Sequence, residues 1–242
     1  MRISHFGIML QDKPTNRINK ELYLSAKPEG MRSWTEAHYV KQIAKADLNY
    51  DLNMAYFNSL DFEQFNSYLL QKCKKHKFVE CSDLKELDNK TGVYMLVLDG
   101  YKQVYIGVSD NIKRRIINHW NKRKSLERLI FGDVCNSILS IDSFGALDTT
   151  RIFYIETIST YKTEEKIVRQ FFSGYMLNRT AGGIGSVETN TDDETMAKLS
   201  VLANRKTRNL IAFLDIDKLK SIVSDADFRY YLKRYPELSD KI

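Results

Sequence analysis

Hydrophobic and polar positions alternate differently in three regions of the 242-residue chain. Residues 1–87 follow a mostly helical periodicity after an irregular start, and residues 187–242 return to that periodicity. Residues 88–186, between them, carry short β-prone runs followed by helical segments. The pattern predicts an α+β fold, in which a small central domain at 88–186 has mainly helical extensions at 1–87 and 187–242.

The central region contains a strong hairpin signal. An apolar, β-prone run at 93–98 is followed by Asp99-Gly100, a pair that favours a tight turn, and then by a second run at 103–107. A third run, at 151–158, alternates in the manner of a strand. We therefore expect a central three-stranded antiparallel sheet flanked by helices.

Capping residues predict where several helices begin. Ser33-Trp34-Thr35-Glu36 has the form of a capping box and predicts a helix running toward Ala46. Asp61, Asp110 and Thr163 are expected to cap three further helices, and another helical stretch is expected over 125–140. Each of the three capped helices is expected to bury one side. The buried residues are Phe62, Phe65, Leu69 and Cys73 after Asp61, then Ile112, Ile116 and Trp120 after Asp110, and Ile167, Val168, Phe171, Phe172 and Tyr175 after Thr163.

Composition narrows the class of protein. Hydrophobic residues make up 43% of the chain, which is enough to bury a core and argues against disorder. The net charge of +6 favours a polyanionic partner, although such a charge also serves solubility. The chain has three cysteines and no long apolar segment. We expect a cytoplasmic protein that binds no membrane and, in a bacterial cell, associates with the nucleoid.

Several short motifs lie at defined spacings in the central region. Tyr105 follows Tyr94 by eleven residues, and Arg115 follows Tyr105 by ten, on the expected next helix. The motif elements, in chain order, are Gly92-Val93-Tyr94, Tyr105-Ile106-Gly107, Arg115, His119, Glu164 with Ile167 and Val168, and Asn178. Over residues 90–182 the chain resembles the GIY-YIG nuclease superfamily. Within it, the chain is most similar to the phage and homing-endonuclease members. Two positions depart from the pattern: the first tripeptide is GVY, and Val108 stands where many relatives have a lysine.

The resemblance implies a metal-dependent endonuclease that hydrolyses phosphodiester bonds of nucleic acid, with double-stranded DNA as the expected partner. Glu164 would hold a single Mg²⁺ (or Mn²⁺), because a hard cation prefers carboxylate, water and phosphate oxygens. Arg115 would clamp the non-bridging phosphate oxygens with its planar fork. Tyr94 or Tyr105 would orient the attacking water and accept its proton, and His119 would assist that transfer or hold a phosphate.

Each of these residues also has a simpler interpretation. A strand tyrosine is most often packing, and an arginine within Lys113-Arg114-Arg115 is most often solvated surface. A glutamate in the first turn of a helix is expected from the helix dipole alone. Only the combination of residues favours catalysis, and the choice of Glu164 over Glu165 depends on the spacing to Ile167 and Val168.

Basic residues around these motifs are candidates for nucleic-acid binding, with solvated charge as the alternative. The candidates are Lys113, Arg114, Lys122, Arg123 and Asn178 in the central region, and Lys198, Arg205 and Lys206 behind it. The last three belong to a segment that faintly resembles the short helical DNA-binding motifs of phage-type homing endonucleases; a helix packed back on the domain is equally compatible. The alternative function is a nucleic-acid-binding protein that uses an inactive or weakly active GIY-YIG domain as a scaffold.

Overall fold

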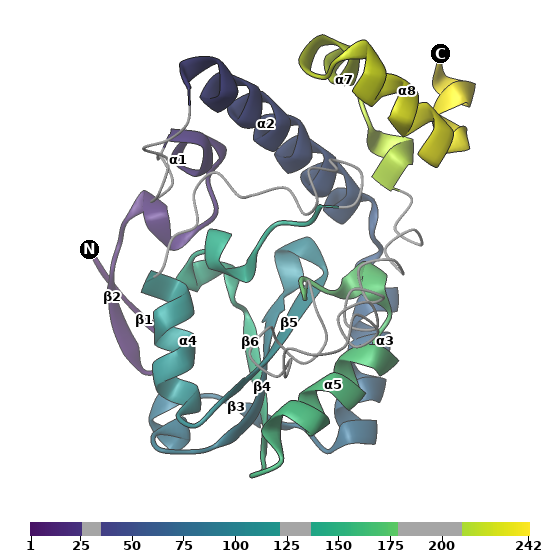
Figure 1. Cartoon of the computed structure of the whole chain (residues 1–242). Coiled ribbons are helices and arrows are strands. Elements are labelled where there is room, and N and C mark those ends of the chain that lie inside the picture. The colour runs from purple at the N-terminus through teal and green to yellow at the C-terminus, as the bar shows by residue number, and fades with distance from the viewer. Residues whose placement is uncertain (26–34, 122–136, 179–209) are drawn as a thin grey trace.

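The computed structural model describes residues 1–25, 35–121, 137–178 and 210–242 (Figure 1). The fold is mixed α+β, as the sequence predicts. The strands are β1 (Arg2–His5), β2 (Ile8–Gln11), β3 (Val79–Cys81), β4 (Gly92–Leu98), β5 (Gln103–Ser109) and β6 (Arg151–Glu156). The described α-helices are α1 (Lys20–Ser25), α2 (Glu36–Ser59), α3 (Phe62–His76), α4 (Ile112–Asn121), α5 (Thr160–Gln170), α7 (Ile216–Ile222) and α8 (Asp225–Arg234).

The main sheet has four antiparallel strands in the order β3-β6-β4-β5. The predicted hairpin is confirmed as β4 and β5, which pair from Gly92↔Ser109 to Leu98↔Gln103. The expectation of three strands was wrong, because β3 adds a fourth strand by pairing with β6. Three residues are too few to show a strand periodicity, so only tertiary pairing reveals β3.

A second, two-stranded sheet lies at the start of the chain, where the sequence pattern predicted only irregular structure. β1 and β2 pair antiparallel from Arg2↔Gln11 to His5↔Ile8. Phe6 and Gly7 form the turn, both with positive φ. Gly7 meets the demand for positive φ without strain, whereas Phe6 is a residue type that rarely adopts it.

One face of the main sheet is covered by α3 and α5, which lie together on the same side in Figure 1. Buried side chains of the two helices and the sheet form a hydrophobic cluster on this face. It includes Phe65, Leu69 and Cys73 of α3, Ile167 and Val168 of α5, and Val93, Met95, Val97, Val104, Ile106 and Phe153 of the sheet. The helix α3 therefore contributes to the same core as the hairpin. Phe62 and Phe172, expected on the buried sides of their helices, are exposed.

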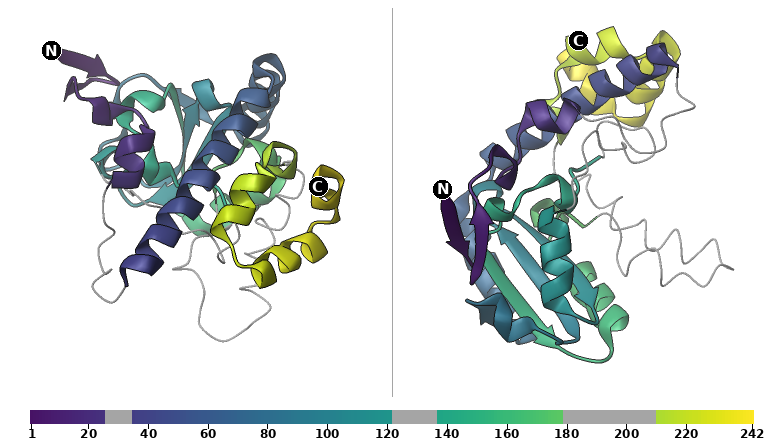
Figure 2. Two further views of the ribbon diagram at one scale, coloured as in Figure 1. Left: turned by 90° about the horizontal axis from the view of Figure 1, so that it is seen from above. Right: turned by 90° about the vertical axis from the view of Figure 1, so that its left-hand side faces the viewer.

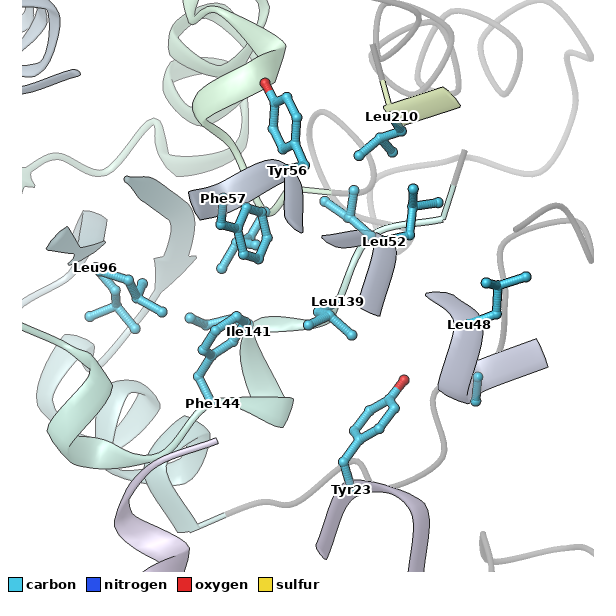
Figure 3. Close-up of a cluster of buried hydrophobic side chains, with 14 of the residues drawn as sticks. Tyr23, Leu48, Leu52, Tyr56, Phe57, Leu96, Leu139, Ile141, Phe144 and Leu210 are labelled. Atoms are coloured by element: carbon cyan, nitrogen blue, oxygen red, sulfur yellow. The ribbon is translucent and has the colours of Figure 1, made fainter. Parts of the chain in front are cut away.

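The opposite face of the sheet packs against α4, α2 and residues 138–144. Figure 3 shows side chains of α2, of this segment and of the sheet converging in one cluster, with Phe57, Ile141 and Leu96 among them. Because β4 has a neighbouring strand on each side and a packed layer on each face, all seven of its residues are buried. This explains why its sequence is a continuous apolar run and not an alternating one.

The C-terminal residues pack against α2, as Figure 2 shows from two further directions. Leu210, Leu214 and Leu219 are buried there. Lys218 of α7 forms ion pairs with Asp47 and Asp51 of α2. The described part of this region is helical, as predicted, and it adds to the core of the protein.

Several predicted helix starts shift by one to four residues. Thr35 caps α2 by accepting a hydrogen bond from the backbone of His38, and that helix continues to Ser59 instead of ending near Ala46. Asp61 caps α3 as predicted. Asn111, not Asp110, accepts the capping hydrogen bond at the start of α4, from Arg114 N. Helix α5 begins at Thr160, so Thr163 is not its cap. Residues 137–140, the described end of the predicted stretch 125–140, are not helical.

Candidate active site

A cleft of about 610 Å³ opens at the free edge of β5, between α4 and the start of α5. Residues 176–178 lie along the first half of β5, where Leu177 N donates to Val104 O over 2.8 Å. The cleft is lined by Tyr105 and by the second half of β5 from Gly107 onward. Its lining residues are Thr91, Tyr105, Gly107, Val108, Ser109, Asp110, Arg114, Arg115, Asn118, Ile158, Thr160, Tyr161 and Glu164. Three residues chosen from the sequence, Tyr105, Arg115 and Glu164, thus meet in one cleft from three separate elements.

The two motif tyrosines lie on the same face of the sheet but differ in access. Tyr94 pairs with Gly107 and Tyr105 pairs with Leu96, so the two phenols are diagonal neighbours with ring centroids 6.2 Å apart. Tyr105 lines the cleft, whereas Tyr94 is 0% exposed. A Cβ on Gly107 would collide with the Tyr94 hydroxyl, so glycine at this position lets the phenol cross β5.

Tyr94 belongs to a buried chain of hydrogen-bonding groups. Its Oη lies 2.8 Å from Nε2 of His119, and Nδ1 of His119 lies 2.5 Å from Oδ1 of Asp142. His119 is 4% exposed and Asp142 is 8% exposed. His119 is therefore held beneath the cleft by two partners. This geometry favours a part in proton transfer over direct phosphate binding, the two roles that the sequence left open.

Arg115 projects from α4 beside both phenols. Burial alone would lower the pKa of Arg115, but Tyr94, Tyr105 and Asp142 nearby raise it, so the guanidinium stays charged. Its neighbour Ile116 is buried against the sheet, which anchors the helix while Arg115 faces the cleft. A fixed, planar cation at a cleft wall is suited to binding the oxygens of a phosphodiester.

Both phenols are neutral at physiological pH. Burial raises the pKa of Tyr94 well above its ordinary value, with the Tyr105 phenol adding to the rise and the Arg115 guanidinium opposing it. Burial, followed by the negative charge of Glu164, raises the pKa of Tyr105 to about 12, again against Arg115. Tyr105 in the protein alone is thus a hydrogen-bonding phenol and not a base.

The structure distinguishes the two adjacent glutamates of α5. Glu164 is 5% exposed and lines the cleft. Glu165 points away and pairs with Arg169 over 2.8 Å, one turn further along the helix. Because α5 begins at Thr160, Glu164 lies in its second turn, where the helix dipole explains a buried carboxylate less well than it would in the first turn.

The donor set of the cleft fits a hard divalent cation. Within the described ranges, no three His, Cys, Asp or Glu side chains gather into a metal-binding cluster. Glu164 and Asp110 are the carboxylates that line the cleft, and Asp110 forms an exposed ion pair with Arg114. Glu164 is the residue that would hold Mg²⁺ or Mn²⁺, and the volume of the cleft leaves room for the water and phosphate oxygens that complete such a coordination shell.

Asn178 supports β5 from within the fold. Its Oδ1 accepts a hydrogen bond from Ile106 N at 2.9 Å, and its Nδ2 donates to Ile106 O at 2.7 Å. The side chain is buried, so the contact fixes the strand segment between Tyr105 and Gly107. The sequence grouped Asn178 with the nucleic-acid contacts, whereas the structure shows it as a clamp on the strand that carries Tyr105.

The basic candidates divide into two groups. Arg114 lines the cleft, and Lys113 pairs with Asp88 over 2.8 Å on the outer side of α4. The other candidates lie outside the described residues: Lys122, Arg123, Lys198, Arg205 and Lys206.

Sequence reasoning missed Asp142, Ile158 and Tyr161. Asp142 follows His119 by 23 residues and has no motif around it, so only the fold brings the two together. Ile158 is 97% exposed at the rim of the cleft, and Tyr161 is also exposed there. An isoleucine open to solvent beside a cleft is a signal in a structure, but the sequence alone shows it only as the end of a strand pattern.

Comparisons of the chain with protein-family models, with curated proteins and with solved structures give no match. The described helices include none with the length and apolar character needed to cross a bilayer.

Proposed function

We propose that the protein is a metal-dependent endonuclease that hydrolyses phosphodiester bonds of DNA in the cleft beside β5. The observation that carries the proposal is the meeting of Tyr105, Arg115 and Glu164 in this cleft. The three residues come from β5, α4 and α5. Phosphodiester hydrolysis needs an oriented water, a cation for the phosphoryl oxygens and stabilisation of the leaving oxygen, and these side chains offer a group for each of the three tasks.

Each residue of the cleft has a distinct part in the proposed reaction. Arg115 binds the non-bridging oxygens of the scissile phosphate and stabilises the charge that develops on them. Tyr105 hydrogen-bonds the attacking water and orients it toward the phosphorus. Glu164 would hold a divalent cation, which would supply positive charge to stabilise the leaving oxygen.

The raised pKa of Tyr105 limits when this residue can act as the base that takes the proton of the attacking water. Tyr105, with a pKa of about 12, must first lose its own proton before it can accept one from water, and this requires its pKa to fall in the complex. The negative charge of Glu164 contributes to the rise, so a cation held by Glu164 works in the direction that favours the phenolate. Tyr105 therefore orients the water in the free protein and becomes a candidate base only in the loaded complex.

The test is cleavage of supercoiled plasmid by the purified full-length protein. We expect conversion to nicked or linear DNA in the presence of Mg²⁺ or Mn²⁺, with loss of cleavage when EDTA removes the cation. Tyr105→Phe is expected to cut far more slowly while binding DNA with nearly unchanged affinity. Tight DNA binding without cleavage under any divalent cation would support the scaffold alternative instead.

A further inference from the structure

Asp142 has no role in the reaction proposed above. It is a buried carboxylate on a 3-10 turn, Ile141–Ser143, that packs against α4. Ser140 caps the turn, and Ile141 and Phe144 on either side of Asp142 are buried in the core. The carboxylate is therefore held in place before any substrate binds. Its Oδ1 lies 2.5 Å from His119 Nδ1.

We propose that Asp142 is a positioning residue that holds His119 in the Nδ1–H tautomer, and that this tautomer turns the oxygen of Tyr94 toward Arg115. The inference rests on the proposed function for its catalytic consequence. The hydrogen-bond chain itself depends only on the contacts among Asp142, His119 and Tyr94.

The direction of each hydrogen bond follows from what each group can donate. An ionised carboxylate only accepts, so His119 Nδ1 must carry the hydrogen toward Asp142. In a neutral imidazole, Nε2 then has a free lone pair and accepts the hydroxyl hydrogen of Tyr94 over 2.8 Å. The Tyr94 oxygen keeps its lone pairs for a donor on its other side. Arg115, which has donors and no acceptor, interacts with Tyr94 there.

The opposite tautomer would disrupt this arrangement. A hydrogen on Nε2 would point at the Tyr94 oxygen, and the Tyr94 hydroxyl would have to turn away from His119. That hydroxyl would then compete with the donors of Arg115 for the same space. Asp142 thus selects the one arrangement in which Tyr94 accepts from Arg115 and fixes the guanidinium at the cleft wall. Loss of the carboxylate partner of a metal-bound histidine typically costs about 10- to 100-fold in activity, and we expect a loss of the same order at His119.

The decisive readout is the tautomer of His119 in the full-length protein. The chain has four histidines, so ¹⁵N-histidine labelling gives a simple spectrum in which His119→Gln identifies the signal of interest. In the neutral form of His119 we expect a protonated Nδ1 and an unprotonated Nε2. Asp142→Asn is expected to convert it to the Nε2–H form or to a mixture. Asp142→Glu, which keeps a carboxylate, is expected to restore the wild-type pattern at least in part.

The matching functional measurement is the single-turnover cleavage rate on bound DNA. We expect Asp142→Asn to lower this rate by about 10- to 100-fold, with little change in Kd for DNA. The control is Asp148→Asn, because Asp148 is a buried carboxylate on the next 3-10 turn that bonds the backbone of Gly145 and Ile18. Asp148→Asn is expected to lower thermal stability but to leave the His119 tautomer unchanged.

Three results would overturn the proposal. They are a wild-type His119 with hydrogen on Nε2, an Asp142→Asn variant with an unchanged tautomer, or a changed tautomer with an unchanged cleavage rate. Failure of the proposed function looks different. A protein that cuts no DNA but shows the expected tautomers would leave the hydrogen-bond chain intact and refute the nuclease proposal.

Discussion

The hydroxyl of Tyr94 occupies the space directly over Gly107, its partner residue across the β4–β5 pairing. Because Gly107 has no side chain in this space, the Tyr94 phenol reaches across β5 to His119. Gly107→Ala would drive a Cβ into the phenol and displace Tyr94 from His119. We expect a loss of stability of about 1–3 kcal/mol from overpacking, and a fall in cleavage rate larger than that loss explains.

The control for this prediction is Gly100→Ala in the β4–β5 turn. A Cβ at Gly100 meets no atom within 4 Å, so the change is expected to shift stability by less than about 0.5 kcal/mol. Chemical denaturation and single-turnover rates on both variants provide the comparison. Equal, small effects at positions 107 and 100 would show that the Tyr94 contact has no part in the site.

Arg115→Lys tests whether the guanidinium acts through its shape or only through its charge. Lysine keeps the charge and much of the attraction to DNA but loses the planar fork that can bind two phosphate oxygens together. We expect nearly normal DNA binding and a cleavage rate lowered by about a hundredfold or more. Arg169→Lys, an exposed position of α5 paired with Glu165, is expected to change neither quantity. A lysine variant that cuts at the wild-type rate would reduce Arg115 to a general phosphate anchor.

The raised pKa values of Tyr94 and Tyr105 predict how stability depends on alkaline pH. Both phenols are protonated in the folded protein above the pH, about 10, at which an unfolded tyrosine ionises. The folded state therefore binds more protons in this window. The free energy of unfolding should be unaffected by these groups below about pH 10 and should fall as pH rises toward 12.

Difference ultraviolet titration between wild type and Tyr105→Phe isolates the Tyr105 phenol. Without divalent cations we expect no tyrosinate signal from Tyr105 near pH 10 and ionisation only at about pH 12. A signal that appears near pH 10 would mean that Tyr105 is not shielded from water as the structure shows.

Residues before the hairpin contribute to the core of the central region. Leu69 of α3 is completely buried against the sheet, while the adjacent Leu70 is 50% exposed. Leu69→Ala is expected to lower the free energy of unfolding by about 2–5 kcal/mol, and Leu70→Ala by less than about 0.5 kcal/mol. Thermal and denaturant unfolding of the full chain would measure both. Equal effects would mean that α3 packs only loosely on the sheet.

Local patterns explain which parts of this fold the sequence could predict. The β4–β5 hairpin and the cap at Asp61 each depend on a few neighbouring residues, and the structure confirms them. The strand β3 is too short to show a period, and it forms only because β6 is there to pair with it. Tertiary contacts, which no local pattern encodes, decide such elements.

Some residues of the candidate site could be predicted from the sequence, and others could not. Glu164 and Arg115 could be chosen from their spacing, and both line the cleft. Asp142 could not be chosen, because its partner His119 is far away in the sequence and the intervening residues carry no motif. The different access of Tyr94 and Tyr105 also depends on the twist and packing of the whole sheet.

The most direct test of the central claim compares Glu164→Gln with Glu165→Gln in single-turnover cleavage of bound DNA in Mg²⁺. Glutamine keeps the size of the side chain and removes the charge that holds a cation. We expect Glu164→Gln to bind DNA and fold normally but to cut nothing measurable. Glu165→Gln, which loses only an ion pair with Arg169, should cut at the wild-type rate. Undiminished cleavage by Glu164→Gln would exclude Glu164 as the metal ligand, and loss of cleavage in Glu165→Gln alone would move the site to the neighbouring residue.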